Sequence, residues 1–191
     1  YEIRSGDWSS DVCSSDLFLN PHSNHGQGYL FLELFLKTFN LNEVWEKINN
    51  LNIDVECEMS TDQQRRIDIV IRAGNNDFLI GIENKIYLKT QDQKLQLEHY
   101  NDFLKESAGE NYILIYLTPS GKDVSEYTMN DNLKSELVAV NKFHHISYEE
   151  HIIPLVREWH VRCQAIRVKS FLQDFEQFLK NQYFKNFKMK K

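Results

Sequence analysis

Two consecutive stretches in the first half of the chain carry the hydrophobic pattern of β-strands. In residues 53–59, apolar side chains alternate with acidic ones, which is typical of a half-buried strand. In residues 65–72, the same alternation predicts a strand with three isoleucines on one face. The isoleucines are Ile67, Ile69 and Ile71, and the opposite face holds Arg66, Asp68 and Val70.

A third strand is predicted over residues 78–86, after a reverse-turn signal of Gly, Asn and Asp residues. It is apolar on both faces until Glu83, so we expect it to be central in the sheet and covered on both sides. The next pattern predicts a helix over residues 90–106, opened by a capping box of Thr90 and Gln93. Its inward positions are Leu97, Tyr100 and Leu104.

The remaining elements surround this core in the sequence. Residues 30–48 have the spacing of one amphipathic helix. Residues 113–117 form an unbroken apolar strand, and its position after a helix favours parallel pairing with its neighbour. Residues 138–140 together with 143–146 predict one more strand. The order strand–strand–strand–helix–strand predicts an α/β fold with a mixed central sheet flanked by helices.

The C-terminal part is predicted to be mostly helical. Ser147 with Glu150 caps a helix that Pro154 should kink or restart. A last amphipathic helix begins at Ser170 and leads to a lysine-rich tail.

The first seventeen residues lack hydrophobic periodicity, and residues 7–17 resemble a translated DNA-sequencing adapter. We therefore interpret 1–17 as a non-native leader and 18–191 as one domain whose native N-terminus, with any helix before Phe18, has been lost. A disordered polar leader is the alternative.

The charge, cysteine content and hydrophobicity of the chain indicate how it could bind nucleic acid and in which compartment it works. Residues 1–17 hold one basic and four acidic residues, so the formal charge of −6 becomes −3 without them. A mildly acidic chain contacts nucleic acid through a local groove rather than through bulk charge. Cys13 lies in residues 1–17, and the two isolated cysteines outside them, Cys57 and Cys163, suggest a reducing cytoplasm. No apolar run is long enough to span a membrane, and the sequence leaves the oligomeric state open.

The candidate chemistry lies at the end of the third strand. Glu83 and Lys85 are two residues apart, so they fall on the same side of a strand, and a hairpin register can bring Asp68 to them. Two carboxylates near the backbone carbonyl of Asn84 make an oxygen site suited to Mg²⁺ or Mn²⁺, with Glu58 as a further acid. The alternative is a solvated charged patch, against which the buried character of the preceding residues argues.

The set Glu58, Asp68, Glu83, Asn84 and Lys85, on strand–strand–strand–helix–strand, resembles the PD-(D/E)XK nuclease superfamily. The phrases NPHSNHGQG, RRIDIVI, IGIENKI and QLEHY are similar to one bacterial branch of it. The resemblance implies a restriction-endonuclease-like core, Asp68 and Glu83 as metal ligands and Lys85 as the catalytic lysine. Ile67 replaces the proline of the family name. The acid that the superfamily often takes from a first helix would fall in the segment occupied by 1–17. The sequence therefore leaves open that this chain is inactive although its parent is active.

Gln96 and Tyr100 lie four residues apart on one helical face. They match the Gln-x-x-x-Tyr element of exonuclease members of the superfamily, where it helps position DNA or the lysine. Packing of Tyr100 in the core is an equally open interpretation.

The function implied is a Mg²⁺-dependent deoxyribonuclease with DNA as its partner, in phage defence or restriction. One alternative is a catalytically inactive module on the same scaffold that binds DNA or a protein. Another is a metal-dependent phosphoesterase that acts on RNA or a nucleotide.

Overall fold

A five-stranded sheet forms the centre of the molecule. The computed structural model describes residues 18–61, 65–85 and 93–184, so the predicted leader lies outside the described residues. The strands are arranged side by side in chain order: β1 (Ile53–Ser60), β2 (Arg66–Ala73), β3 (Phe78–Asn84), β4 (Tyr112–Thr118) and β5 (Phe143–Ser147).

The pairing of the strands changes direction at β3. β1, β2 and β3 pair antiparallel, whereas β3, β4 and β5 pair parallel. The parallel pairs need crossovers, which α4 (Gln96–Ala108) and α5 (Asp131–Ala139) supply. The predicted α/β class with a mixed sheet is confirmed, and β3 is central and buried along its whole length, as its unbroken apolar pattern predicts.

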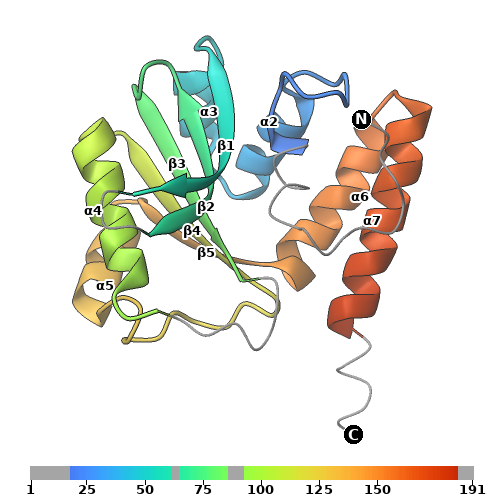
Figure 1. Cartoon of the computed structure of the whole chain (residues 1–191). Helices are drawn as coiled ribbons and strands as arrows, with labels where there is room; N and C mark the ends of the chain where they lie inside the picture. The colour runs from blue at the N-terminus through green and yellow to red at the C-terminus, as the bar shows by residue number, and fades with distance from the viewer. Residues whose placement is uncertain (1–17, 62–64, 86–92, 185–191) are drawn as a thin grey trace, which may run out of the picture.

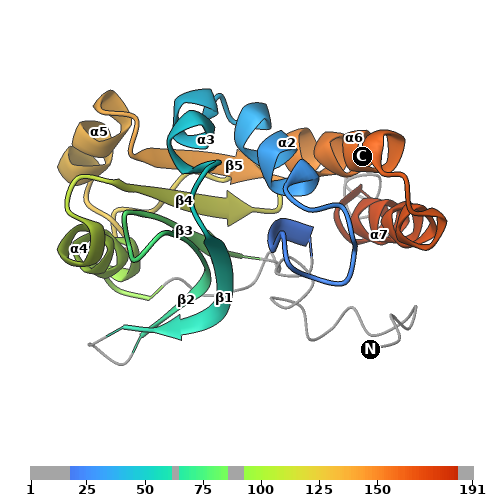
Figure 2. The ribbon, with the colours of Figure 1, turned by 90° about the horizontal axis from the view of Figure 1, so that it is seen from above.

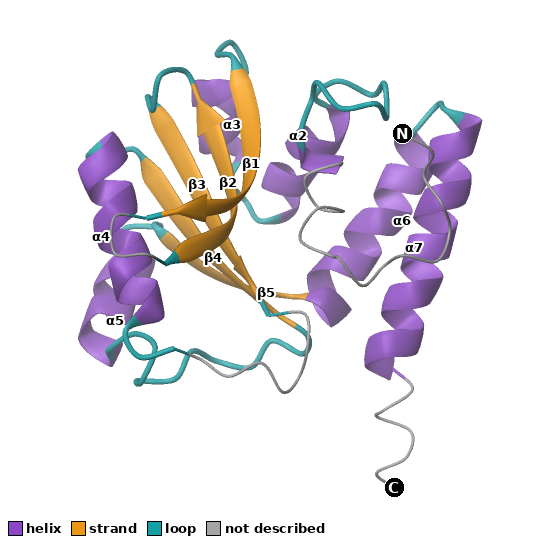
Figure 3. Cartoon of the chain, in the orientation of Figure 1, coloured by secondary structure: helices purple, strands orange, loops and turns teal. Residues whose placement is uncertain are grey.

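Helices cover both faces of the sheet (Figures 1 and 3). α4 and α5 pack on one face, against a cluster that includes Val70, Leu79 and Leu114. The other face carries α2 (Leu30–Thr38), α3 (Asn42–Ile48), α6 (Ile153–Arg162) and α7 (Ile166–Phe184). α6 and α7 lie side by side at one end of the molecule (Figure 2). Among the described residues, no helix is both long and apolar enough to cross a membrane.

The single helix predicted over residues 30–48 is wrong, because the chain folds into α2 and α3. Asn40 takes a left-handed backbone conformation, with φ of 57°. The amide groups of Phe39 and Asn40 bond back to the last turn of α2, which ends that helix. The hydrophobic spacing continues across the break, so periodicity alone did not reveal it.

Two further boundaries differ from the predictions. Residues 138–140 were predicted as strand, but Val138 lies near the C-terminal end of α5. This helix begins after Asn130, whose side-chain oxygen accepts the N–H of Leu133 and caps it. α4 begins at Gln96 rather than at residue 90, after a left-handed Leu95. Thr90, half of the predicted capping box, lies outside the described residues.

The C-terminal prediction is largely confirmed. The Ser147 hydroxyl accepts the N–H of Glu150 and caps a π-helical turn, η1 (Tyr148–Ile152). Pro154 then lies in the first turn of α6, where a proline is tolerated. The last helix, α7, begins at Ile166, four residues earlier than predicted.

The alternation of β2 breaks at Asp68. Ile69 and Ile71 face α2 and α6, but Ile67 lies in the opposite cluster, with Val70, so the prediction that the three isoleucines share a face is wrong. The backbone pairs on either side of Asp68 in the β1–β2 ladder are regular, but Asp68 and Glu58 between them are not paired.

Candidate active site

A local opening between β2 and β3 creates the site. Backbone pairing of these strands ends at Ile69 and Ile82, whereas β3 stays paired with β4 as far as Asn84. Asp68 lies at the opening, and its Oδ2 accepts the backbone N–H of Asn84 over 2.6 Å. A side chain thus takes over a bond that the β-ladder no longer makes, and it holds the Asp68 carboxylate beside the end of β3.

Glu83 and Lys85 point to the same side, as their spacing predicts. Lys85 Nζ lies 2.7 Å from Glu83 Oε1, and both residues are buried, at 3% and 7% exposure. Three charged groups from two strands therefore gather where β2 and β3 separate, and Asp68, Glu83 and Lys85 are brought together. A buried ion pair of this kind carries a desolvation cost that only its own contacts offset.

Gln96 and Tyr100 of α4 complete the hydrogen-bond network. The Gln96 amide donates to Glu83 Oε1 and to the Tyr100 hydroxyl, each over 2.9 Å, and its oxygen accepts Lys85 Nζ over 3.0 Å. The Tyr100 hydroxyl donates to the backbone carbonyl of Arg66. Tyr100 is also part of the core on the α4 face, as one of the two interpretations of this residue predicts. The role of the Gln96–Tyr100 element in positioning DNA or the lysine stays a prediction.

The electrostatics of the two carboxyl groups follow from burial. Burial raises the pKa of the Glu83 carboxyl from 4.5 to about 7, and the charge of Asp68 adds to the rise. Burial also raises the pKa of Asp68, while the Asn84 N–H and the charge of Lys85 oppose it. The protein thus holds two acids that resist ionisation side by side.

The donor set fits a divalent cation. Glu83 Oε2 is buried and has no hydrogen-bond partner in the described structure. An anionic oxygen of this kind is satisfied by its own proton or by a cation. Carboxylate and carbonyl oxygens are the hard ligands that Mg²⁺ and Mn²⁺ prefer, so Asp68, Glu83 and the backbone of Asn84 are the residues that would hold such an ion.

Glu58 stands apart from this pair. Its side chain is mostly exposed, and Oε2 accepts Arg66 Nη1 over 3.0 Å. Among the residues described, no three His, Cys, Asp or Glu side chains gather closely enough to hold a metal ion. Glu58 therefore lies at the rim of the site, and two side-chain carboxylates make up its centre. The backbone of Glu58 has a positive φ of 52°, which is costly outside glycine.

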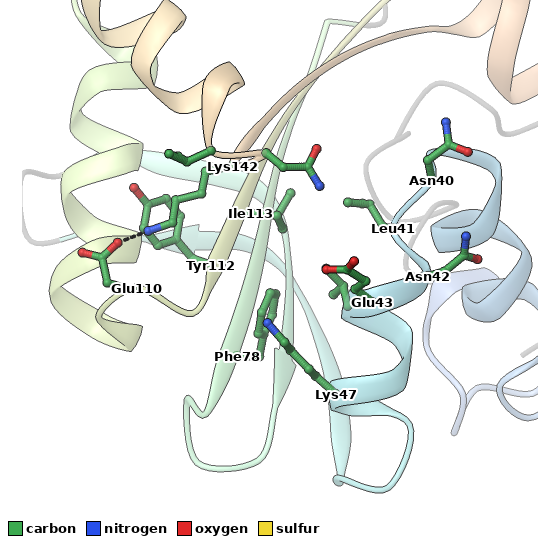
Figure 4. A pocket seen from close by; sticks show the side chains of 13 residues that line it. Asn40, Leu41, Asn42, Glu43, Lys47, Phe78, Glu110, Tyr112, Ile113 and Lys142 are labelled. Carbon is green, nitrogen blue, oxygen red and sulfur yellow. Dashed lines mark hydrogen bonds and ion pairs between the residues drawn. The ribbon is translucent and has the colours of Figure 1, made fainter.

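These residues line a pocket of about 440 Å³. Its walls are formed by Glu58, Arg65, Arg66, Asp68, Glu83, Asn84, Lys85, Gln93, Gln96 and Tyr100. A second pocket, of about 430 Å³, lies at the opposite end of the sheet, around Phe78 and Ile113 (Figure 4). There the Glu110 carboxylate is paired with Lys142, and Glu43 lies across the pocket on α3. Of these two pockets, the first holds the neighbouring carboxylates of Asp68, which is half-buried, and Glu83, which is buried.

Two contributors to the site were not found from the sequence. Arg65 lines the pocket, and the pair of arginines at the start of β2, Arg65 and Arg66, was the signal that could have revealed it. Tyr148, in η1, donates its hydroxyl to Asn84 Oδ1 over 2.8 Å. The two residues are far apart in sequence, and no local pattern connects them.

A family model described as the PD-(D/E)XK nuclease superfamily matches residues 10–185, so the chain belongs to this superfamily. The match begins inside the stretch 1–17, and the interpretation of that stretch as a leader before one truncated domain stays a prediction.

No curated protein matches the chain. A solved repair endonuclease from Pyrococcus abyssi is similar at 19% identity, with a TM-score of 0.32. The alignment covers 58% of this chain and 46% of that one, so the chain spans less than half the length of that protein.

Proposed function

We propose that this protein is a nuclease that uses Mg²⁺ or Mn²⁺ to hydrolyse DNA phosphodiester bonds in the pocket at the end of β3. One observation carries the proposal: the carboxylates of Asp68 and Glu83 meet the ammonium of Lys85 there, and one Glu83 oxygen is left buried without a donor. Membership of a nuclease superfamily agrees with it.

Asp68, Glu83 and the Asn84 carbonyl would hold the ion, with Glu58 at the rim as a further acid. Such an ion supplies a nucleophilic water at neutral pH and stabilises charge on the phosphoryl group. Asn84 contributes through its backbone, because its N–H fixes the Asp68 carboxylate. Gln96 fixes the Glu83 carboxylate from the other side.

Lys85 is the candidate catalytic cation. Its ammonium is held between Glu83 Oε1 and Gln96 Oε1, so its position is set before substrate enters. A preorganised positive charge offsets the charge that develops on the phosphoryl oxygens without further reorganisation. Lys85 also has a third donor with which to orient the attacking water.

The test is cleavage of duplex DNA, single-stranded DNA and RNA with Mg²⁺ and with EDTA. Asp68→Asn, Glu83→Gln and Lys85→Ala should each lower the rate of DNA cleavage by about 100-fold or more, as loss of a preorganised group does. Glu56→Gln is the matched control, because Glu56 lies on β1 outside the pocket and pairs with Arg72. Undiminished cleavage in the three site variants would discard the assignment.

The same assay separates the alternatives. DNA binding that falls with salt, without cleavage by the wild-type chain, would favour a catalytically inactive binding module. Cleavage confined to RNA would favour the phosphoesterase. For a role in phage defence or restriction in the bacterial cytoplasm, phage plating on cells that express the wild type should fall relative to cells with Lys85→Ala.

A further inference from the structure

Arg65 has a guanidinium with one terminal nitrogen hydrogen-bonded and the other without a partner among the described residues. It stands just before β2 and lines the pocket of Asp68 and Glu83. Nη2 donates to the backbone carbonyl of Lys94 over 3.0 Å, which holds the group against the turn before α4. Nη1 is buried and makes no hydrogen bond within the ranges described. A buried N–H donor that has no acceptor carries a desolvation cost.

The other cations of the pocket already have partners. Arg66 Nη1 pairs with Glu58, and Lys85 Nζ pairs with Glu83. Among the ion pairs of the described chain, none involves Arg65. Once Asp68 and Glu83 were neutralised by a cation, Arg65 would be the positive charge in the pocket without a carboxylate of its own.

We infer that Arg65 is a substrate-binding residue whose guanidinium donates to a phosphate oxygen of the nucleic acid in this pocket. The inference rests on the proposed function and names the group that holds the substrate backbone. A guanidinium suits the task, because its planar donors are fixed relative to one another. The bond to Lys94 orients the plane of the guanidinium, which lines the pocket without a carboxylate partner among the described residues.

The contact would give affinity without sequence preference. A phosphate contact neutralises a backbone charge and releases a counterion, so its loss weakens binding to all sequences and lowers the salt dependence of binding. A purely structural role at the Lys94 carbonyl would leave that salt dependence unchanged.

The experiment measures binding of a fluorescein-labelled DNA duplex by the full chain, with Mg²⁺ and over a range of salt concentrations. It is done in the Lys85→Ala background, in which both carboxylates remain and cleavage is expected to be lost. Adding Arg65→Ala should raise Kd about 10-fold or more, as loss of a charge-assisted bond does. The slope of log K against log salt should fall by about one.

Two variants serve as controls. Arg65→Lys keeps the charge but cannot hold the Lys94 carbonyl and a phosphate together, so it should keep the salt slope and recover only part of the affinity. Arg72→Ala removes an arginine of β2 outside the pocket, where it contacts Asn76 and Glu56. It should leave both Kd and the slope unchanged.

The outcomes are distinct. In the otherwise wild-type enzyme, Arg65→Ala should raise KM more than it lowers kcat. An unchanged Kd and slope would overturn the inference, and so would a weaker Kd with an unchanged slope. If the wild-type chain neither binds nor cleaves DNA, the proposed function fails and takes this inference with it. If the wild type cleaves DNA and Arg65→Ala cleaves with the same KM, only the inference fails.

Discussion

Glu83 contacts several polar groups of the site and has a strongly shifted carboxyl pKa. It is buried at the end of β3, one carboxylate oxygen accepts both Lys85 and Gln96, and the other has no donor in the described chain. Burial and the neighbouring Asp68 raise its pKa to about 7. A side chain held in this way is ready to exchange a proton for a cation near neutral pH.

Metal affinity should therefore depend steeply on pH. Below about pH 7 the cation has to displace a proton from Glu83, so the apparent affinity for Mn²⁺ should rise about tenfold per pH unit and level off above it. Calorimetric titration from about pH 5 to about pH 8 measures this dependence. Glu56→Gln should keep the pH dependence and Glu83→Gln should abolish it; an affinity independent of pH in the wild type would contradict the raised pKa.

Without metal, the contribution of Glu83 to folding stability changes with pH in the opposite direction: it falls as pH rises. A carboxyl whose pKa folding raises stabilises the protein in its protonated form. That contribution is complete below the ordinary pKa of 4.5 and is lost as pH rises through about 7.

At the scale of elements, the site depends on how closely α4 packs on β3. Gln96 of α4 reaches Glu83 at the end of β3, and α4 packs closely on the strand at Gly81, two residues before Glu83. A Cβ at Gly81 would lie 2.9 Å from Leu104 Cδ1 and 3.6 Å from Ile67 Cγ2. The absence of a side chain at this position thus sets the distance between helix and sheet.

Gly81→Ala should lower the free energy of unfolding by about 1–3 kcal/mol, because it overpacks a filled core. Denaturant unfolding measures the change. Leu104→Val removes the nearest atoms, so the double variant should be less destabilised than the sum of the two single changes. A more stable Gly81→Ala protein would contradict this prediction and would show that Leu104 can move away from an added methyl group.

At the scale of the whole molecule, the C-terminal helices are connected to the site. The Trp159 indole of α6 donates to the Phe31 carbonyl over 3.1 Å, which joins this region to α2. The Tyr148 hydroxyl in η1 reaches Asn84, between the two charged residues of the site. π-Helical turns occur often near functional sites, and this one carries the contact to the Asn84 side chain.

Tyr148→Phe should therefore affect both folding and function. Loss of the hydroxyl leaves Asn84 Oδ1 buried without its donor, so the free energy of unfolding should fall by about 1–3 kcal/mol. Cleavage should fall as well, because Asn84 also fixes Asp68. Tyr127→Phe is the matched control, since Tyr127 is exposed and its removal should change stability by less than about 0.5 kcal/mol. Normal stability and cleavage in Tyr148→Phe would rule out this connection.

Local hydrophobic patterns located the first four strands of the sheet and the charged end of β3, but they wrongly extended the fifth strand to residues 138–140. Alternation predicted β1, β2 and the shared side of Glu83 and Lys85, and the unbroken apolar run predicted a central β3. These features follow from the two-residue period of side chains along a strand, which can be seen in the sequence of that strand alone.

The sequence by itself determined the order of the strands and of the helix between β3 and β4, the mixed sheet, and the acids and lysine that meet at one strand end. The tertiary structure alone decided the break at Asn40, the side of Ile67, the rim position of Glu58 and the bond from Tyr148 to Asn84. The physical reason is range. Periodicity reports the side to which a residue points along its own element, whereas the opening of β2 from β3 and the contacts across it depend on partners far away in the chain.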